Sequence, residues 1–341
     1  MPYRIVIEPS GRSFLCQEGE TILRAGLKAG VRLPYSCNSG LCSSCKGFLL
    51  EGDVELRFHS PFALTQSEKE EGFILCCQAV PQSDCVVEIE ELPLTRGELL
   101  PVGEYVTELV AIEPLTHDMS IFRFLIRDGR EVRFKAGQYA LLTVPGTTEK
   151  RAYSMSNSPS ESDRFEFVIK KVPGGLATTY LFERARVGEQ FRIEGPYGFA
   201  YLREDDSRDI LCIAGGSGIS PILSIVKRAF ELGLDRSRKL HVYYGGRTRR
   251  DIFCTEDIKR WEREHPNFRF IPAISHPVEG DLERWTGEVG FITDIVAKHL
   301  PDYGDLKVYM AGPTPMTKAA LKVLIGKKKM RAEDIHYDEF G

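Results

Sequence analysis

The most constraining feature of this sequence is a set of cysteines near its N-terminus. Cys37, Cys42 and Cys45 lie in one short loop, separated by four and then by two residues, and the adjacent Cys76 and Cys77 follow further along. Three thiolates in one loop and a fourth from a distant segment make the kind of cage that holds a [2Fe-2S] cluster. A chain that builds this cage must fold so that the two segments meet.

The residues between the cysteines favour an iron-sulfur cluster over the alternatives. Residues 36–45 are small and polar apart from one leucine, so the backbone can fold tightly around an inorganic core and direct amide hydrogens at its sulfides. A zinc ribbon prefers two separated Cys-x-x-Cys pairs, and this sequence has one. Nine cysteines, with nothing resembling a secretory signal, do not suit a disulfide framework. A zinc site or redox-active thiols remain the alternatives.

The hydrophobic pattern predicts a multidomain protein that combines α+β and α/β domains. Residues 1–95 alternate like strands around one short helix at 21–29, and the prolines and glycine of 92–101 indicate a linker. Residues 102–203 contain short strands separated by turn signals, which is typical of a barrel. Residues 208–341 alternate apolar strands with helical stretches, which predicts a parallel sheet with helices on both faces.

Charge is concentrated in the first predicted domain. Residues 1–95 carry eight basic and thirteen acidic side chains, whereas the rest of the chain is nearly balanced. An acidic surface can attract a basic patch on an electron acceptor, and it disfavours nucleic acid as a partner. No apolar run approaches the roughly 20 residues that span a bilayer, so we expect a cytoplasmic monomer without a membrane anchor.

The end of the cysteine pattern resembles plant-type ferredoxins, which are small β-grasp domains. In that family the last ligand is followed by a short stretch like Gln-Ala and then by a proline, as in Cys77-Gln78-Ala79-Val80-Pro81 here. The resemblance implies that Cys77, and not Cys76, is the fourth ligand. The implied metal ligands are Cys37, Cys42, Cys45 and Cys77.

Two motifs in the predicted barrel suggest a phosphate-containing cofactor. Arg151-Ala152-Tyr153-Ser154 is followed about twenty residues later by a glycine pair that opens a helix-like segment. Free amides and the positive end of a helix dipole bind phosphate oxygens, and an arginine can pair with the same group. A tyrosine offers a flat face to a ring system.

The order of these motifs resembles the ferredoxin-NADP reductase superfamily, which has a six-stranded antiparallel flavin-binding barrel. By this resemblance Arg151 contacts the flavin phosphate, Tyr153 packs on the ring and Ser154 hydrogen-bonds near N5. A pyrophosphate site implies FAD rather than FMN. The other residues that the resemblance assigns to the flavin are Ala152, Val168, Lys170, Gly174, Gly175, Leu176, Ala177 and Thr178.

A second glycine-rich loop follows the strand at residues 210–214. Gly215-Gly216-Ser217-Gly218 precedes Ser220 and Pro221, which we predict as the N-cap and the first residue of a helix. A strand, a glycine turn and a capped helix make a pyrophosphate cradle, as in a Rossmann-like domain. By resemblance to the family this loop, with Ser220 and Pro221, binds nicotinamide nucleotide together with Ala311, Gly312, Pro313 and Met316. Many family members have a cysteine where this chain has Ala311, so hydride transfer must rely here on stacking and on Ser154.

The C-terminal residues complete the implied site. The family ends in an aromatic residue that covers the flavin, which makes Phe340 a gate and Asp338 the nearby acid. Arg247 and two neighbouring arginines suit a 2′-phosphate, but relatives that use NADPH often have arginine at the position of His276. We therefore expect NADH rather than NADPH.

The whole order of domains resembles the reductase components of bacterial multicomponent oxygenases, including those of aromatic hydrocarbon catabolism. This resemblance implies that electrons pass from NADH through FAD and a [2Fe-2S] cluster to a terminal oxygenase or hydroxylase, which the acidic ferredoxin domain would contact. Two alternatives are a reductase for a non-oxygenase acceptor such as a deoxysugar dehydratase, and a redox sensor that keeps both cofactors without turnover. The organic substrate belongs to the partner and is not encoded in this chain.

Overall fold

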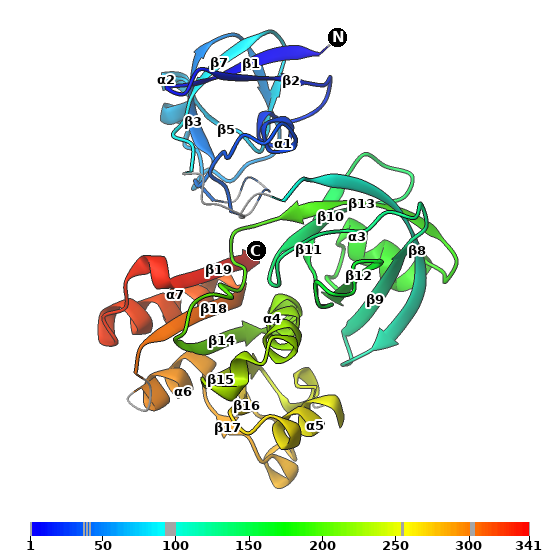
Figure 1. Cartoon of the computed structure of the whole chain (residues 1–341), viewed down its shortest axis with the longest axis vertical. Coiled ribbons are helices and arrows are strands. Elements are labelled where there is room, and N and C mark those ends of the chain that lie inside the picture. The colour runs from blue at the N-terminus through cyan, green and yellow to red at the C-terminus, as the bar shows by residue number, and fades with distance from the viewer. Residues whose placement is uncertain are drawn as a thin grey trace. The chain divides into compact units, whose positions relative to one another are not determined.

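The computed structural model describes residues 2–36, 38, 40, 42–92, 100–253, 256–300 and 304–340. These residues form two compact units, 1–103 and 104–341 (Figure 1). The second unit contains two sheets, each with its own hydrophobic core. The domain boundaries expected from the sequence, 1–95, 102–203 and 208–341, stay predictions.

The first unit is built on a five-stranded mixed sheet in the order β2-β1-β7-β3-β5. Its central strand β7 runs parallel to β1 and antiparallel to β3. Helix α1 packs on the sheet through Gly26, where a Cβ would lie within 3.1 Å of the Phe14 ring. This helix confirms the one expected at 21–29. The elements are β1 Tyr3–Glu8, β2 Arg12–Cys16, α1 Ile22–Lys28, β3 Lys46–Glu51, β4 Val54–Leu56, α2 Gln66–Glu71, β5 Phe73–Leu75, β6 Ala79–Pro81 and β7 Cys85–Glu88.

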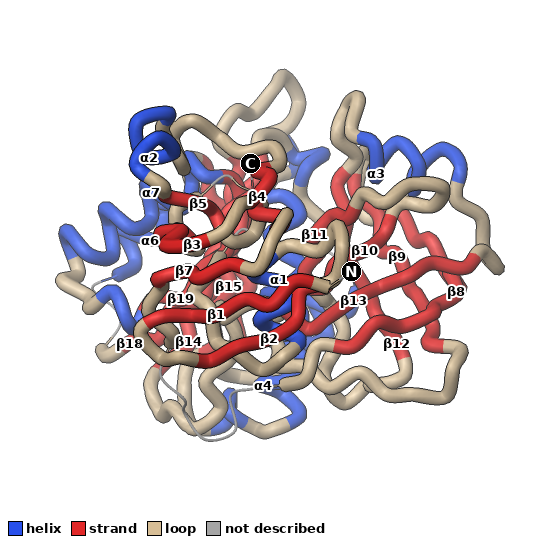
Figure 2. Tube along the Cα trace, turned by 90° about the horizontal axis from the view of Figure 1, so that it is seen from above, coloured by secondary structure: helices blue, strands red, loops and turns tan. Residues whose placement is uncertain are grey.

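The second unit begins with a six-stranded sheet in the order β11-β10-β13-β8-β9-β12. A bridge between Met155 and Phe167 joins the two outer strands and closes the sheet into the expected barrel. Its interior is aromatic, with Phe122, Phe124 and Phe165 fully buried. Figure 2 shows these strands running together, with α3 beside them. The elements are β8 Gly103–Pro114, β9 Met119–Ile126, β10 Tyr139–Thr143, β11 Lys150–Ser154, β12 Arg164–Lys170, α3 Leu176–Thr179, a π-helical turn Tyr180–Arg184 and β13 Gln190–Tyr197.

The remainder of this unit is a parallel sheet in the order β17-β16-β15-β14-β18-β19. Apolar side chains of α4 and α5 pack on one face and those of α6 and α7 on the other, as expected from the sequence. The elements are β14 Asp209–Gly215, α4 Ile219–Glu231, β15 Leu240–Gly246, α5 Glu256–Glu264, β16 Phe268–Ile274, β17 Glu288–Val289, α6 Ile292–His299, β18 Leu306–Pro313, α7 Thr314–Leu321, a π-helical segment Lys322–Lys327 and β19 Ile335–Phe340. Short 3-10 turns lie at Gly216–Gly218, Leu234–Arg236, Arg249–Asp251, Leu282–Arg284 and Ala332–Asp334.

The strand order places a crevice-forming position at the end of β14. The connection after β14 leads to β15 on one side and the connection after β18 leads to β19 on the other, so the strand order switches direction between these two neighbouring strands. Ligands of open parallel sheets bind at such switch points. The glycine loop of residues 215–218 lies there.

The barrel and the parallel sheet share one apolar cluster. Met119, Ala136, Val168 and Leu202 of the barrel pack with the side chains of α4 and β14. This common core explains why the barrel and the parallel sheet form a single unit.

A buried charge network holds the C-terminal edge of the parallel sheet. Asp334 accepts from Lys307 at 2.9 Å and pairs with Arg208 at 2.8 Å and Arg331 at 3.0 Å. The hydrogen bond from Arg208 holds the pKa of Asp334 well below its usual range. Because the Lys307 ammonium is itself nearly buried, it depends on this carboxylate and on that of Asp206, which lies farther away at 3.5 Å.

We predict that Asp334→Asn lowers the free energy of unfolding by about 3 kcal/mol, because it leaves the buried Lys307 charge poorly compensated. The adjacent Glu333, which is 67% exposed and pairs with Arg331, provides the control. Glu333→Gln should change stability by less than about 0.5 kcal/mol. Denaturant unfolding of both variants measures the difference, and equal values would contradict the prediction.

Candidate functional site

The structure brings two of the predicted cluster ligands into contact. The thiols of Cys45 and Cys77 are hydrogen-bonded, and this contact together with burial raises the pKa of Cys45. The Cys76 amide donates to the Cys45 carbonyl at 3.0 Å, which fixes the two segments side by side. Cys42 is half-buried in the same loop, and Cys37 lies outside the described residues.

The loop around these cysteines is held in a strained and crowded path. Asn38 and Gly40 both have positive φ, 50° and 76°. A Cβ on Gly40 would lie 2.6 Å from the Phe58 carbonyl oxygen, so only glycine fits there. The Gln78 side-chain amide donates to the Cys77 sulfur at 3.6 Å. Soft sulfur donors with an amide donor beside them fit an iron-sulfur cluster.

Cys76 has a different environment from its neighbour. Its side chain is fully buried, and burial raises the pKa of its thiol to about 12. Burial alone does not separate the two residues, because it also raises the pKa of the predicted ligand Cys45. The contact of Cys77 with Cys45 supports Cys77 as the choice between the two, and the assignment stays a prediction.

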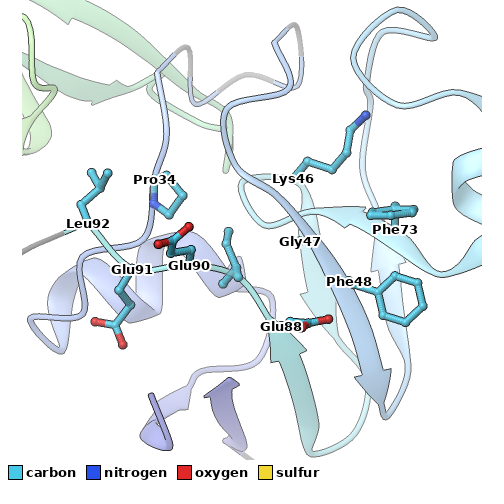
Figure 3. Close-up of a pocket in the computed structure, with 10 residues that line it drawn as sticks. Pro34, Lys46, Gly47, Phe48, Phe73, Glu88, Glu90, Glu91 and Leu92 are labelled. Carbon is cyan, nitrogen blue, oxygen red and sulfur yellow. The ribbon is translucent and has the colours of Figure 1, made fainter. Parts of the chain in front are cut away.

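A groove of about 640 Å³ lies on the same unit, between β3, β5 and the end of β7 (Figure 3). Phe48 and Phe73 form its apolar wall, with ring centroids 5.2 Å apart. Glu88, Glu90 and Glu91 also line it, and Lys46 is the one basic residue of its lining. Glu91 pairs with Arg12, and Lys46 pairs with Glu68. The charge that the groove presents is therefore acidic and comes from Glu88 and Glu90, and the groove lies next to the cysteine loop in sequence through Lys46.

The two flavin motifs meet at the seam of the barrel. The antiparallel bridge between Met155 and Phe167 points the start of β11 and the end of β12 the same way. Arg151 and the glycine pair beyond β12 therefore share one end of the seam. Arg151 is exposed, and its guanidinium donates to Glu149 at 2.9 Å. Tyr153 packs on Phe167 with centroids 6.0 Å apart, and burial raises the pKa of its hydroxyl.

The glycine pair opens a very short helix. Gly174 has φ 71°, and Gly175 is the N-cap of α3. Thr178 ties this turn to the barrel, because its hydroxyl donates to the Val172 carbonyl at 3.0 Å and accepts from the Val172 amide at 3.2 Å. Leu176 is exposed and Ala177 is buried. These exposed amides and the nearby guanidinium fit a flavin pyrophosphate.

Lys170, at the end of β12, reaches toward the glycine loop of the parallel sheet. Its side chain is the nearest group to Gly216, at 3.9 Å from a Cβ built there. Its ammonium pairs with Asp118 at 3.0 Å. His117, Asp118 and Asp251 lie close enough to share a metal ion, but the Lys170 ammonium already balances Asp118. We therefore interpret this cluster as an ion-pair network.

The loops after β14 and β18 touch through glycine. A Cβ on Gly218 would lie 2.0 Å from the Ala311 carbonyl oxygen, and a Cβ on Gly215 would lie 2.7 Å from the Met316 sulfur. Gly312 has φ 156° and also abuts Met316. The structure thus brings the predicted residues 215–218 and 311–316 together. Such a cradle of closely spaced backbone amides fits a dinucleotide pyrophosphate.

The predicted helix cap is wrong. Helix α4 begins at Ile219 with Gly218 as its N-cap, so Ser220 and Pro221 lie inside the first turn. The Ser220 hydroxyl donates to the Ser154 carbonyl at 2.6 Å and accepts from the Val168 amide at 3.0 Å. The Ser220 hydroxyl bonds to the barrel instead of capping the helix, because the Ser154 carbonyl and the Val168 amide lie within hydrogen-bonding distance of it.

The residues expected near the nicotinamide lie on the edge of the sheet. In the parallel register of β18 and β19, Ala311 pairs with Asp338 and Pro313 with Phe340. Asp338 is 9% exposed, and burial raises the pKa of its carboxyl to about 7. Phe340 is half-buried.

The loops that would contact the adenosine end are linked to each other. Arg247 is exposed, and its carbonyl accepts from the His276 amide at 2.7 Å. The His276 ring packs against Phe291 with centroids 5.6 Å apart and its Nδ1 lies 2.8 Å from the Ser275 hydroxyl. Position 276, where an arginine would suit the 2′-phosphate of NADPH, therefore carries an imidazole.

Two exposed aromatic residues near the cysteines were missed in the sequence. Phe58 is 76% and Phe62 is 97% exposed, although the following Ala63 and Leu64 are buried. The Ser60 amide between them donates to the Gly40 carbonyl at 2.9 Å. Their only sequence signal is a pair of phenylalanines in a segment without strand alternation.

Comparison with known domain families accounts for nearly the whole chain. Residues 5–82 match the 2Fe-2S iron-sulfur cluster binding domain, residues 106–201 the oxidoreductase FAD-binding domain and residues 212–322 the oxidoreductase NAD-binding domain. The reductase component of propane 2-monooxygenase from Mycolicibacterium goodii is 36% identical, over 99% of this chain and 97% of its own length. The reductase component of phenol 2-monooxygenase from Pseudomonas sp. is 35% identical, over 100% and 95%. The chain belongs to the iron-sulfur flavoprotein reductase components.

Solved structures of this reductase family agree with the fold. The ferredoxin reductase of carbazole 1,9a-dioxygenase superposes with a TM-score of 0.85 at 30% identity, covering 100% of this chain and 99% of that one. The Amycolatopsis cytochrome P450 reductase GcoB gives 0.85 at 29% identity, with 99% and 98% covered. The reductase is thus an oxidoreductase with [2Fe-2S], FAD and nicotinamide nucleotide as its cofactors, as predicted. Among its described helices, none combines the length and apolarity that crossing a membrane requires.

The raised pKa of Asp338 in this reductase predicts how stability depends on pH. The native carboxyl keeps its proton up to about pH 7, whereas the unfolded one loses it near 3.8, so the native state loses stability as pH rises between these values. We expect Asp338→Asn to remove a loss of about 2 kcal/mol between pH 5 and 8. Chemical denaturation at several pH values measures it, with Asp294→Asn on the exposed face of α6 as control. Parallel pH profiles for wild type and Asp338→Asn would contradict the prediction.

Proposed function

We propose that this reductase takes electrons from NADH and delivers them, through FAD and the [2Fe-2S] cluster, to the terminal oxygenase or hydroxylase of a multicomponent oxygenase system. The observation that carries the proposal is the end-to-end similarity to the propane 2-monooxygenase reductase component, with all three cofactor domains in the same order. Relatives named for phenol and alkene monooxygenases and for a naphthalene dioxygenase system support the same partner class.

The chain's own residues supply binding and geometry. Arg151 and the turn of residues 174–178 would hold the flavin phosphates, and Tyr153 would pack on the ring. When bound, FAD would supply the chemistry of hydride acceptance, in which one hydrogen nucleus leaves the nicotinamide with its electron pair, and of releasing the two electrons one at a time. Ser154 would orient the reacting edge of the flavin through hydrogen bonding. The cluster would be held by Cys37, Cys42, Cys45 and Cys77.

The nucleotide would lie along the carboxyl edge of the parallel sheet. The loops of residues 215–218 and 311–316 would hold its pyrophosphate, and Phe340 would cover the flavin until the nicotinamide enters. With a pKa of about 7, Asp338 would carry a proton in about half of the molecules at pH 7 and so hold one near the reacting groups. His276 in place of arginine supports NADH, since an imidazole packed on Phe291 is a weaker ligand for a 2′-phosphate than a guanidinium.

The partner would approach the cluster beside Phe58 and Phe62. The segment that carries them touches the cysteine loop through the Ser60 amide, and also through the Ser43 hydroxyl, which donates to the Ala63 carbonyl at 3.0 Å. Exposed aromatic side chains of this kind are typical centres of binding surfaces. The acidic groove and the net negative charge of residues 1–95 would attract a basic acceptor surface. We take the protein to be a cytoplasmic monomer that meets this partner transiently.

The relay is tested by an anaerobic optical titration with NADH and, in parallel, NADPH. We expect both flavin and cluster bands to bleach after about three electrons per molecule. Cys77→Ala should lose the cluster bands while the flavin still bleaches, whereas Cys76→Ala should keep both. NADPH as the better donor would overturn the nucleotide choice. Intact cluster bands in Cys77→Ala would overturn the ligand assignment.

The docking surface is tested by Phe58→Ser combined with Phe62→Ser. We expect cytochrome c reduction to stay within about twofold, while the concentration of oxygenase component needed for half-maximal turnover rises about tenfold or more. Leu15→Ser on β2, which removes another exposed apolar side chain of the same unit, is the control. Slow cluster reduction in the double variant would contradict the assignment of the two aromatic residues to partner docking. A failure of wild-type protein to reduce cytochrome c with either NADH or NADPH would favour the redox sensor alternative.

A further inference from the structure

Helix α4 presents one polar stripe to the barrel. Ser220, Ser224, Lys227 and Glu231 follow one another at spacings of four, three and four residues, which places them on one face of the helix. Each contacts the barrel through a hydrogen bond or ion pair, whereas the apolar residues of the same helix pack in the core shared with β14. Figure 1 shows α4 lying between β14 and the barrel strands.

The stripe follows the barrel segment that begins at the end of the flavin motif. Ser220 donates to the Ser154 carbonyl at 2.6 Å, and one turn later Ser224 donates to the Asn157 carbonyl at 2.7 Å. At the far end, the Ser160 hydroxyl donates to Glu231 at 2.6 Å. The helix and residues 154–160 are therefore fastened in register along their length.

The third contact of the stripe is a buried ion pair. The Lys227 ammonium lies 3.0 Å from Glu166 on β12, and Arg123 approaches the same carboxylate at 2.6 Å. Burial alone would raise the pKa of Glu166, but the charge of Lys227 and the hydrogen bond from Arg123 hold it below its usual value. Glu166 therefore stays ionised, and its ion pair with Lys227 joins the helix to the barrel at a point separate from Ser220.

Ser220 has a special place in this interface. It is the member of the stripe that contacts the flavin motif, and through the Val168 amide it also contacts β12, the other strand of the seam. Two residues before it, Gly218 abuts the Ala311 carbonyl. A continuous path of close contacts thus runs from Ser154 through Ser220 and Gly218 to Ala311. It connects the strand assigned to the flavin with both loops assigned to the nicotinamide nucleotide.

We propose that Ser220 is a positioning residue for electron transfer from the nicotinamide to the flavin. Its hydroxyl fixes the separation between Ser154 and the glycine loop, because a hydrogen bond is directional whereas the apolar core of the interface is not. Transfer between two bound rings is sensitive to displacements of about 1 Å. The proposal rests on the proposed function, which assigns residues 151–154 to FAD and residues 215–218 to the nucleotide.

The experiment compares Ser220→Ala with Ser224→Ala in the full-length holoprotein. Both serines are buried on one face of α4, and both donate to a barrel carbonyl. Stopped-flow flavin bleaching at increasing NADH gives the limiting rate constant and the apparent Kd separately. We expect the limiting rate constant to fall about tenfold or more in Ser220→Ala and less than about twofold in Ser224→Ala, with Kd unchanged in both. Ser220→Thr, which keeps the hydroxyl, should recover most of the rate.

Two further measurements separate positioning from a structural role. Thermal unfolding midpoints should fall in both alanine variants, and further in Ser220→Ala, which loses two buried hydrogen bonds where Ser224→Ala loses one. Hydrogen exchange of the Val168 amide, measured without NADH, should accelerate in Ser220→Ala and stay unchanged in Ser224→Ala.

The proposal would be overturned if the limiting rate constant fell equally in the two alanine variants. It would also be overturned if Ser220→Ala raised only the apparent Kd for NADH. If Ser220→Ala does not fold, Ser220→Cys, which keeps a weak donor of similar size, should show an intermediate rate, and a wild-type rate there would overturn the proposal. If wild-type flavin is not reduced by NADH, the proposed function fails. A normal wild-type rate with no effect at Ser220 would refute the positioning role alone.

Discussion

The interface between α4 and the barrel seam is the contact on which the reaction geometry of this protein depends. The helix belongs to the parallel sheet through its apolar side chains and to the barrel through its polar ones. Buried hydrogen bonds of this kind are expensive to leave unmade, so the two halves of the unit cannot slide past each other without exposing unpaired groups. A site divided between two sheets needs such a constraint, since neither sheet alone determines the distance between two bound rings.

The glycines at the ends of β14 and β18 also fix the distance between the two parts of the site. Gly218 and Gly215 exist because the loops after β14 and β18 approach until no Cβ fits between them. Close approach at a switch point leaves backbone amides as the lining of the crevice. Ala311 contributes its carbonyl to this contact.

The sequence was most informative where function leaves local patterns. The cysteine spacing, the strand alternation of the barrel and the strand-helix alternation of residues 208–341 each depend on neighbours in the chain. The role of Ser220 does not, because its acceptor at Ser154 and its donor at Val168 come from a different sheet. Local rules assigned its hydroxyl to the helix end, and tertiary contacts override that preference. The exposure of Phe58 and Phe62 was equally hidden, since exposure depends on packing and not on residue type.

Carboxylates have different roles in the two units, depending on whether they are buried or exposed. In the second unit, the carboxylates of Glu166 and Asp334 are buried and paired with basic groups, so they contribute fixed geometry. On the first unit, Glu88 and Glu90 line an open groove, where their field reaches solvent. At about 0.1 M salt, exposed charges more than about 10 Å apart are largely screened from each other, whereas buried pairs are screened much less. Ionic strength should therefore change the rate at which the protein associates with its partner. It should have little effect on the alignment of the two bound rings, because that alignment depends on buried contacts.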